Sequence, residues 1–599
     1  MTSEKRFAIS SDPTKTPSSE SPHGAFEQED AFKAGLSDER AIAYDGGNVD
    51  SDAGAFPKMC WKLFGSLSAM SFLWVGSQIG LFLFGSSLVP IYSEIGGADG
   101  IFLWIVIGYL IPNSALCPFV GALSDMFGRK YVAAVGQILL VAGPAVVSNS
   151  HSMTQAIFGM VISGLGAGLN EMIALAGTSE LVPIKKRPFY VSMVIFTISP
   201  FIPSPMWAQL IIRAKNWRYV GFLVGGYNLV GLFLVIFCYY PPPRPHRKLA
   251  MEIVKTVDYW GGILSTLGVT LLMMGMQWGA YQYAWSSAHV LVPFMLGITV
   301  ITAFFVWEIK YAPHPMIPKA VFSKDKRSMI MIFLITFFSG GNFFVMLIFW
   351  PTQVYNVYGD DPIQIGIRTL PIGSGIIFGA AFNLLLFGMF KGRTTFLMIF
   401  WTSVMTVFTA CVSLADRHNL NPMIYAILTI ANVGVGAVIF PASIMAQIYC
   451  PTEYIGTITA ISLAIRYIGG AVGFTAYYNV FYHKLTEEYA IPAGLKIVLA
   501  GITEDYDTLY DLITYAAQAQ YHALRDLIET SPSVTMKGQA VYDDIIFHVQ
   551  EAFVLAYRWP YWISVAFGGA CVGQGYIWQE VRSGRCVVEL SDVLQHMKE

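Results

Sequence analysis

Apolar segments long enough to cross a lipid bilayer follow one another along almost the whole of this 599-residue chain. A membrane-spanning helix needs roughly twenty apolar residues, because its backbone polar groups find no water in the hydrocarbon. Only 13% of the residues are charged, against roughly a quarter in soluble domains. We therefore predict an all-α polytopic membrane protein. Its fourteen spans are expected near residues 67–90, 101–121, 131–149, 154–177, 189–211, 219–240, 259–279, 290–309, 329–350, 364–389, 395–415, 422–447, 455–481 and 560–579.

The short loops between these segments fall into two sets that differ in positive charge. One set carries sixteen Lys and Arg residues, and the loops on the opposite side carry four. Because Lys and Arg accumulate on the cytoplasmic side of a membrane, the first set is predicted to be cytoplasmic. An even number of spans places both termini on that side. We expect the plasma membrane, with a vacuolar or vesicular membrane as the alternative.

Three long segments lie outside the predicted spans. Residues 1–62 are rich in Ser, Pro, Asp, Glu and Gly and are expected to form a disordered cytoplasmic tail, and residues 581–599 form a second tail. Residues 482–559 are predicted to be a long extracellular loop, in which residues 503–530 carry apolar side chains at helical spacing. This amphipathic stretch would either lie over the outer vestibule or the lipid surface, or form a loosely packed cap with no role in substrate binding.

A short charged turn separates the second and third predicted spans, where residues 121–130 read GALSDMFGRK. Gly121 and Gly128 let the helix ends approach closely, while Asp125, Arg129 and Lys130 supply charges that can pair. The turn resembles the loop signature of the major facilitator superfamily, whose members are secondary transporters that work by alternating access. Further stretches resemble its fourteen-span fungal branch of trichothecene efflux pumps and siderophore transporters: NEMIALAGTSELVP (170–183), NWRYVGF (216–222), DYWGGIL (258–264), GIRTLP (366–371) and RYIGGAVGFTAYYNVF (466–481).

This resemblance implies a particular domain organisation. Residues 63–245 would form a first six-helix bundle, and residues 321–481 together with the last span, 560–580, would form a second. Spans seven and eight, within residues 246–320, would be an insertion between the bundles. The substrate would bind between the bundles near the middle of the membrane, and the charged turn would gate the cytoplasmic side.

The sequence also departs from the pattern of that family. Met160 stands where antiporters of the family usually have an Arg in the fourth span. The fifth span keeps Pro200 and Pro203, which predict a kinked helix, but lacks the family's paired glycines. Met126 replaces a commoner basic residue in the turn. These departures weigh against assuming the standard proton antiport mechanism.

Ionisable residues inside the predicted spans are costly in hydrocarbon and are candidates for function. Glu171, beside Asn170, lies near the middle of the fourth span, where desolvation favours a neutral carboxyl group and suits reversible protonation. Glu171, Asn170 and Arg466 are therefore candidates for proton coupling or for contact with substrate. Arg466 lies at a similar depth in the thirteenth span and needs an acidic partner, a water-filled cavity or an anionic ligand. A pair between Glu171 and Arg466 would cross the bundle interface. For both residues a structural role is the alternative.

Other polar residues are assigned by their depth in the spans. Glu180 and Arg187 are expected to extend the charged turn into a cytoplasmic network, and Arg368 to lie at the outer vestibule. The Gly-rich stretch 164–168 and the glycines after Arg466 are interpreted as surfaces for close helix packing. Neutral amides and aromatic residues within the second bundle suggest a cavity for a bulky, moderately polar organic molecule. These cavity candidates are Asn342, Trp350, Gln353, Asn383, Tyr477 and Tyr478.

We therefore predict a secondary transporter that exports a small organic toxin or secondary metabolite and is coupled to protons. Uptake of ferric siderophores is the first alternative, and a nutrient receptor that does not transport is the second. The expected partners are the small organic substrate, protons and the lipid bilayer, and the protein is expected to be a monomer. No Walker sequence, nucleophile elbow or His/Cys metal spacing occurs, so we expect no ATP, no cofactor, no metal, no nucleic acid and no enzymatic activity.

Overall fold

The computed structural model describes residues 61–96, 101–182, 187–241, 258–279, 283–313, 315, 319–322, 326–359, 361–390, 394–417, 422–450, 455–490, 508, 511–512, 521–530 and 538–596. They belong to one compact unit, Lys58–Pro241 with His246–Glu599. A second unit, Met1–Pro57 with Pro242–Pro245, lies outside the described residues, as does nearly all of the predicted tail 1–62.

The described part of the chain is helical, and its one β-type contact is an isolated bridge between Gly279 and Tyr283. In the first half the α-helices are α2 (Trp61–Gly85), α3 (Leu88–Ile95), α4 (Trp104–Phe127), α5 (Arg129–Ser148), α6 (Met153–Leu181), α7 (Arg187–Phe196), α8 (Ser204–Ala214) and α9 (Arg218–Cys238). In the second half they are α11 (Tyr259–Trp278), α12 (Ala288–Val306), α13 (Lys326–Phe344), α14 (Trp350–Tyr358), α15 (Pro362–Met389), α16 (Thr394–Cys411), α17 (Pro422–Tyr449), α18 (Ile455–His483), α21 (Tyr521–Thr530) and α22 (Gly538–His596).

Short helices of other types join or extend these elements. The 3₁₀-helices are η1 (Ile101–Leu103), η3 (Ser199–Phe201), η5 (Lys319–Phe322) and η7 (Val412–Leu414). The π-helices are η4 (Trp307–Tyr311), η6 (Val345–Phe349) and η9 (Lys484–Ala490).

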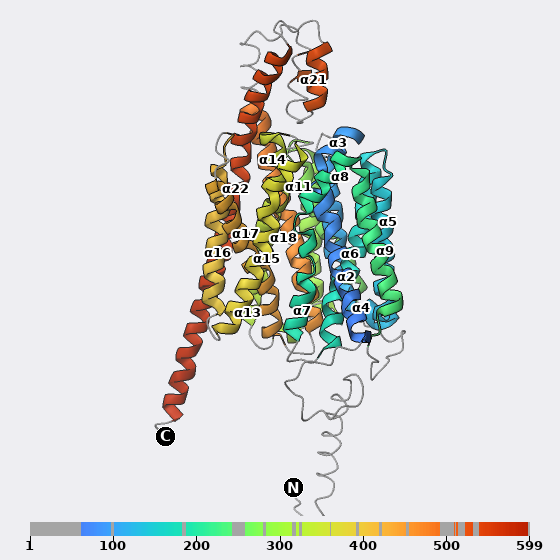
Figure 1. Cartoon of the computed structure of the whole chain (residues 1–599). Helices are drawn as coiled ribbons and strands as arrows, with labels where there is room; N and C mark the ends of the chain where they lie inside the picture. Colours follow the sequence, from blue (N-terminus) through green and yellow to red (C-terminus); the bar gives the residue numbers. More distant parts are fainter. Residues whose placement is uncertain are drawn as a thin grey trace, which may run out of the picture. The chain divides into compact units, whose positions relative to one another are not determined.

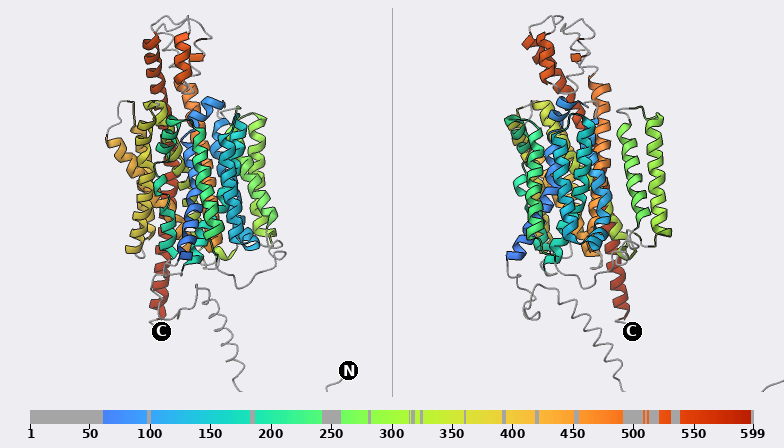
Figure 2. Two further views of the ribbon diagram at one scale, coloured as in Figure 1. Left: turned by 45° about the vertical axis from the view of Figure 1, so that its right-hand side comes forward. Right: turned by 90° about the vertical axis from the view of Figure 1, so that its right-hand side faces the viewer.

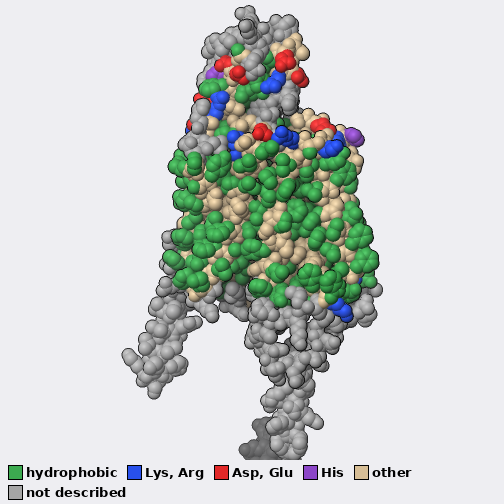
Figure 3. Space-filling model, in the orientation of Figure 1, with side chains coloured by type: hydrophobic (Ala, Val, Ile, Leu, Met, Phe, Trp, Pro, Cys, Tyr) green, Lys and Arg blue, Asp and Glu red, His purple; other side chains and the backbone are tan. Residues whose placement is uncertain are grey.

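Thirteen helices of the described residues are long and apolar enough to cross a membrane, and each coincides with one of the first thirteen predicted spans. The predicted fourteenth span lies within α22, which packs against α13 and α16. Figure 1 shows these helices side by side, and Figure 3 shows a broad belt of apolar side chains with charged residues gathered beyond its edges. An apolar belt of this kind is the surface expected of a protein that spans a bilayer.

The spanning helices form two bundles of six and one separate pair. Helices α2, α4, α5, α6, α7–α8 and α9 pack together, and so do α13–α14, α15, α16, α17, α18 and α22. The bundles meet where α4 contacts α18 and where α8 contacts α15. Helices α11 and α12, which lie between the two bundles in the sequence, pack on each other, and α11 also contacts α4 and α18 (green, at one side in the right-hand view of Figure 2).

Glycines allow several of these helices to touch through their backbones. A Cβ atom on Gly164 of α6 would lie 2.4 Å from the Tyr109 carbonyl oxygen of α4. On α18, a Cβ atom on Gly469 would lie 2.0 Å from the Phe337 carbonyl oxygen of α13. The packing role predicted for these glycine stretches is confirmed, since no larger side chain fits at either place.

Within residues 482–559, predicted to be a loop, the described segments are helical. Helix α18 continues into η9 as far as Ala490, and α22 begins at Gly538, well before the predicted span. Helix α21 covers the end of the predicted amphipathic stretch and packs on α22, with Leu524 and Ile528 buried. Most of the rest of that stretch lies outside the described residues.

Candidate functional site

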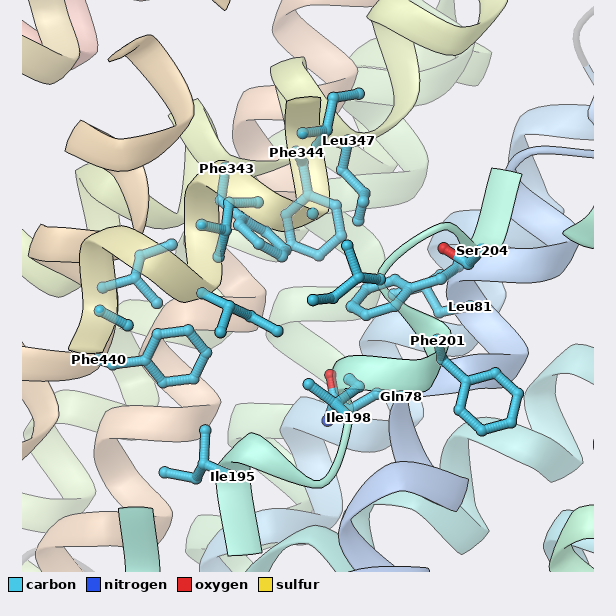
Figure 4. Close-up of a pocket in the computed structure, with 18 of the residues that line it drawn as sticks. Gln78, Leu81, Ile195, Ile198, Phe201, Ser204, Phe343, Phe344, Leu347 and Phe440 are labelled. Carbon is cyan, nitrogen blue, oxygen red and sulfur yellow. The ribbon is translucent and has the colours of Figure 1, made fainter. Parts of the chain in front are cut away.

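A central cavity lies between the two bundles. Its lining comes from α2 and the α7–α8 segment of the first bundle and from α13, α15, α17 and α18 of the second. The space between these walls, counted together with the part that is open to solvent, is about 990 Å³. Figure 4 shows side chains from both bundles around this space, among them Phe343 from α13, Phe440 from α17 and Ile198 from the α7–α8 segment.

The wall of the central cavity is mainly apolar. Five of its 24 lining residues carry a hydroxyl, amide or charged group, and these are Gln78, Ser204, Thr369, Arg466 and Tyr467. The Thr369 hydroxyl is used within its own helix, where it donates to the Ile365 carbonyl at 2.9 Å. Polar groups available to a ligand are therefore concentrated where Gln78, Arg466 and Tyr467 lie.

A buried ion pair stands behind this polar part of the wall. Arg466 Nη2 of α18 donates to Glu171 Oε1 of α6 at 2.8 Å, so the pair joins the two bundles. The Tyr467 hydroxyl donates to Glu171 Oε2 at 2.7 Å, and Gln78 Nε2 of α2 donates to the Tyr467 hydroxyl at 3.2 Å. Both carboxylate oxygens thus have a donor, as a buried charge requires. The pairing predicted for Glu171 and Arg466 is observed.

Close packing fixes the backbone that carries this pair. A Cβ atom on Gly340 of α13 would lie 2.4 Å from the Arg466 carbonyl oxygen, so α13 passes directly against this turn of α18. On α6, a Cβ atom on Gly168 would lie 3.0 Å from the Asn113 carbonyl oxygen of α4. Gly168 and Gly340 therefore let neighbouring helices pack closely against the turns of α6 and α18 that carry the two charges.

Asn170 points away from this group. Its amide oxygen accepts from the backbone N–H of Gln137 and its nitrogen donates to the Ala133 carbonyl, each at 3.1 Å on α5. Asn170 therefore ties α6 to α5 within the first bundle and does not join Glu171 in the group around the ion pair.

The charged turn lies at one end of the bundles, which we call the Arg129 end. Gly128 adopts a φ of +91°, the left-handed region that glycine enters freely, and there α4 ends and α5 begins. Arg129 pairs with Glu180 at the end of α6, and the Lys130 ammonium lies 5.3 Å from the Tyr240 ring centroid.

Other residues predicted for this turn are only partly described. Gly121 lies in the last turns of α4, where its carbonyl accepts from the Ser124 hydroxyl at 2.8 Å. The side chains of Asp125 and Arg187 lie outside the described residues. Their predicted part in a gate and a charge network stays a prediction.

The fifth span is interrupted where the sequence places its two prolines. Helix α7 ends at Phe196, η3 contains Pro200, and Pro203 precedes α8. This break bends the chain around the central cavity, where Ile198, Phe201 and Ser204 form part of the wall.

Arg368 and two of the cavity candidates lie near the opposite end of the second bundle. Arg368 Nη1 donates to the Tyr358 carbonyl at 3.2 Å, and its guanidinium lies over the Tyr358 ring. The Trp350 indole N–H donates to the Arg368 carbonyl at 3.0 Å. Tyr478 makes an edge contact with Phe102 of the first bundle, with ring centroids 6.1 Å apart.

The remaining cavity candidates bond to neighbouring helices. Tyr477 donates to Asn342 Oδ1 at 3.0 Å, Gln353 accepts from the Tyr561 hydroxyl at 2.7 Å, and Asn383 donates to the Ala437 carbonyl. None of the six candidates is among the residues that line the central cavity. Phe343, which directly follows the candidate Asn342 in the sequence, does line the central cavity.

Gln78 and Tyr467 are the site residues that the sequence reasoning missed. Tyr467 directly follows Arg466, so a search of the neighbours of a buried charge would have found it. Gln78 is an amide within an otherwise apolar stretch of α2. Neither side chain is charged, and neither therefore stands out from the packing residues of a membrane helix.

The end of the molecule opposite Arg129, which we call the α3 end, holds a further ion pair. Arg218 Nη2 lies 3.1 Å from Glu94 Oε1, and Trp217 Nε1 donates to Glu94 Oε2 at 2.6 Å. Burial alone would raise the pKa of Glu94, but hydrogen bonds from Trp217, Arg218 and Asn216 outweigh it and lower that pKa below its usual value. The group ties α3 to the start of α9 within the first bundle.

Comparisons with known proteins agree with this architecture. The chain is 24% identical over 536 residues to the MFS-type transporter ucsD of an Acremonium species, covering 88% of this chain and 85% of that one. It is 28% identical to the MFS-type transporter pydD of Acremonium, but over only 52% of this chain and 54% of that one. The efflux pump aflT of Aspergillus parasiticus is 25% identical, with 65% and 75% covered.

Solved structures show the same fold at low sequence identity. The structure titled "Crystal structure of peptide transporter POT in complex with sulfate" matches with a TM-score of 0.53 and 14% identity, over 90% of this chain and 98% of that one. A bacterial homologue of the lysosomal transporter Spinster matches with a TM-score of 0.52 and 13% identity, over 87% and 99%. The family model described as "Major Facilitator Superfamily" matches residues 70–474, more than half of the chain. The chain therefore belongs to the major facilitator superfamily, and it is a membrane transporter rather than an enzyme.

Proposed function

We propose that the protein exports a bulky, mainly apolar and uncharged organic molecule in exchange for protons. The observation that carries this proposal is the apolar central cavity with one buried ion pair, Glu171 with Arg466, at its wall. The cavity defines what is carried, and the ion pair provides a group whose charge a proton can change.

The composition of the wall supports an uncharged substrate. Most lining side chains are aliphatic or aromatic, and the one charged lining residue, Arg466, is already paired with Glu171. The Trp74 indole N–H also lies in the wall, with no partner among the described residues. A ligand that buries apolar surface and accepts a hydrogen bond from Trp74 fits such a wall. A polar metal chelate would lose its hydration there with few partners in return.

The position of the ion pair supports coupling to protons. Glu171 belongs to α6 of the first bundle and Arg466 to α18 of the second, so their attraction holds the bundles together near the cavity. A proton on Glu171 removes its charge and weakens that attraction. Alternating access requires the bundles to rock against each other, and protonation of Glu171 would lower the cost of breaking this contact.

Sidedness and direction rest on charge distribution and relatives. The Lys- and Arg-rich loops support a cytoplasmic position for the Arg129 end, where Asp125, Arg129 and Glu180 would gate the cavity. Relatives described as efflux proteins include the efflux pump aflT and the MFS-type efflux transporter ffsH of Aspergillus flavipes, which supports export. We place the protein in the plasma membrane as a monomer.

The test is accumulation of a neutral lipophilic dye, Nile red, and of a panel of fungal toxins in yeast that lacks its own drug pumps and siderophore carriers. Cells with the protein should accumulate less of at least one of these compounds, and a protonophore should abolish the difference. Glu171→Gln should remove the effect of the protonophore without loss of protein from the membrane. Glu94→Gln is the matched control, since it makes the same chemical change at the α3 end, away from the cavity.

Two results would refute the proposal. Greater accumulation of iron from labelled ferric siderophores would make the protein an importer. Export that survives in the Glu171→Gln variant and still responds to the protonophore would show that the coupling residue lies elsewhere.

A further inference from the structure

Glu171 does not touch the central cavity. Its side chain has 0% of its surface exposed, and it is absent from the lining, whereas its two hydrogen-bond donors, Arg466 and Tyr467, both line the cavity. A proton that moves between the cavity and Glu171 must therefore pass through or around these side chains.

Of these two donors, only the tyrosine can pass a proton on. The Arg466 guanidinium has donors but no acceptor site, and it does not deprotonate in proteins. A hydroxyl group both donates and accepts, and the Tyr467 hydroxyl already donates to Glu171 Oε2 at 2.7 Å. Its oxygen also accepts, since Gln78 Nε2 donates to it at 3.2 Å.

Gln78 sets the direction in which this hydroxyl points. Gln78 Nε2 donates to the Tyr467 oxygen at 3.2 Å, and the Tyr467 hydroxyl has a closer acceptor in Glu171 Oε2, at 2.7 Å, than in Gln78 Oε1, at 3.5 Å. Because the amide presents a donor to the oxygen, the hydroxyl hydrogen turns toward the Glu171 carboxylate. Gln78, which also lines the cavity, is thus a positioning residue for the Tyr467 hydroxyl.

We propose that Tyr467 relays protons between the central cavity and Glu171, an inference that rests on the proposed function. A hydronium ion in the cavity gives a proton to the Tyr467 oxygen; one of its own O–H bonds breaks, a new O–H bond forms on Tyr467, and water remains. The former hydroxyl hydrogen passes to Glu171 Oε2 as the old O–H bond breaks. Tyr467 ends as a neutral phenol, Glu171 ends as a neutral carboxylic acid, and the reverse sequence returns the proton.

The other titratable groups near Glu171 come from α4 and define a competing route. The Tyr109 hydroxyl lies near Glu171 but donates to the Ser77 backbone carbonyl. Cys117 also lies near Glu171, and its thiol contacts Asn113 Oδ1 at 3.4 Å. Neither Tyr109 nor Cys117 lines the cavity, so a route through α4 would reach Glu171 without the cavity water.

The experiment follows protonation of Glu171 directly in the purified full-length protein in lipid vesicles. After a rapid drop in pH, time-resolved infrared difference spectroscopy records the carbonyl stretch of a newly protonated carboxyl group. The band that disappears in Glu171→Gln belongs to Glu171. Tyr467→Phe removes the hydroxyl and keeps the ring against Arg466, and Tyr109→Phe is the matched control, since it deletes a buried tyrosine hydroxyl that does not contact Glu171.

The relay predicts that the band in Tyr467→Phe appears at least about tenfold more slowly than in the wild type, while Tyr109→Phe keeps the wild-type rate. An unchanged rate in Tyr467→Phe would overturn the relay and favour the route through α4. The proposed function has a separate test. It fails if the Glu171→Gln variant still exports with proton coupling, and that result does not depend on the rate measured in Tyr467→Phe.

A second variant, Gln78→Met, tests the relay independently if Tyr467→Phe folds poorly. Gln78→Met preserves the Tyr467 hydroxyl but removes the donor that orients it, so the band should again appear more slowly, though by less than in Tyr467→Phe. A wild-type rate in Gln78→Met would show that Gln78 does not orient the relay.

Discussion

The buried pair of Glu171 and Arg466 predicts a rescue that distinguishes an electrostatic contact from ordinary packing. At an effective dielectric constant of about 20, unit charges separated by the observed 2.8 Å attract each other by about 6 kcal/mol. Much of this attraction offsets the cost of taking both charges out of water. Removing one partner of such a pair costs about 3–5 kcal/mol, whereas replacing both by apolar side chains is often neutral.

We therefore expect Glu171→Leu and Arg466→Met each to lower the melting temperature of the protein by several degrees. The double variant should melt above either single variant, because it leaves no unpaired charge in the wall. The assay is thermal unfolding of the purified protein in one detergent, with retention of monodisperse protein after heating as the readout. Export should remain uncoupled from protons in the double variant, so stability and coupling separate.

Two outcomes of these melting measurements would refute this reasoning. If the two losses of melting temperature simply add in the double variant, the contact carries no coupling energy and each residue acts through its own packing. Unchanged melting of both single variants would mean that water or ions reach the charges and replace the missing partner.

Three further predictions concern other parts of the protein. Glu94→Gln should melt below the wild type at neutral pH. Because the folded-state pKa of Glu94 lies below its usual value of 4.5, this difference should shrink as the pH falls below 4.5 and should vanish below the folded pKa, as thermal unfolding across a pH series would show. Gly373→Val should lower the export rate by about tenfold or more at normal abundance, since a Cβ atom there would lie 2.5 Å from the Ile202 carbonyl oxygen and would push α15 from the α7–α8 segment. Arg129→Glu and Glu180→Arg should each lower the rate of export measured in cells. The double exchange should restore much of that rate, because it re-forms the pair with its charges swapped. Absence of recovery in the double variant would contradict a role for this pair.

The sequence identifies the charged half of the candidate site for a physical reason. A lone carboxylate or guanidinium in an apolar span is so costly that it demands a partner, and Glu171 and Arg466 satisfy each other across 295 positions of sequence. The neutral half was missed, because Gln78 and Tyr467 carry no such cost and resemble packing residues.

For neutral polar residues, the sequence alone does not predict which side chains face the cavity. Asn170 and Asn383 were expected to face substrate, yet each makes hydrogen bonds to the backbone of a neighbouring helix. An amide in a membrane helix can satisfy itself in this way or face a cavity, and only the rotation of the helix about its axis decides between the two. That rotation depends on packing against several other helices, and the spacing of residues within one span does not specify it.

The charge of the cavity wall gives the proposed exchange a direction. With Glu171 ionised, the pair with Arg466 has no net charge, so an uncharged substrate can occupy the cavity while the carrier itself stays neutral. With Glu171 protonated, the positive charge of Arg466 is uncompensated, and the carrier bears one net positive charge as it crosses. A membrane potential of 100 mV, negative inside, favours inward movement of that charge by about 2.3 kcal/mol. The substrate-bound step thus proceeds outward without electrical cost, and the potential drives the protonated return. In the proposed exchange, this one buried ion pair would couple both the proton gradient and the membrane potential to export.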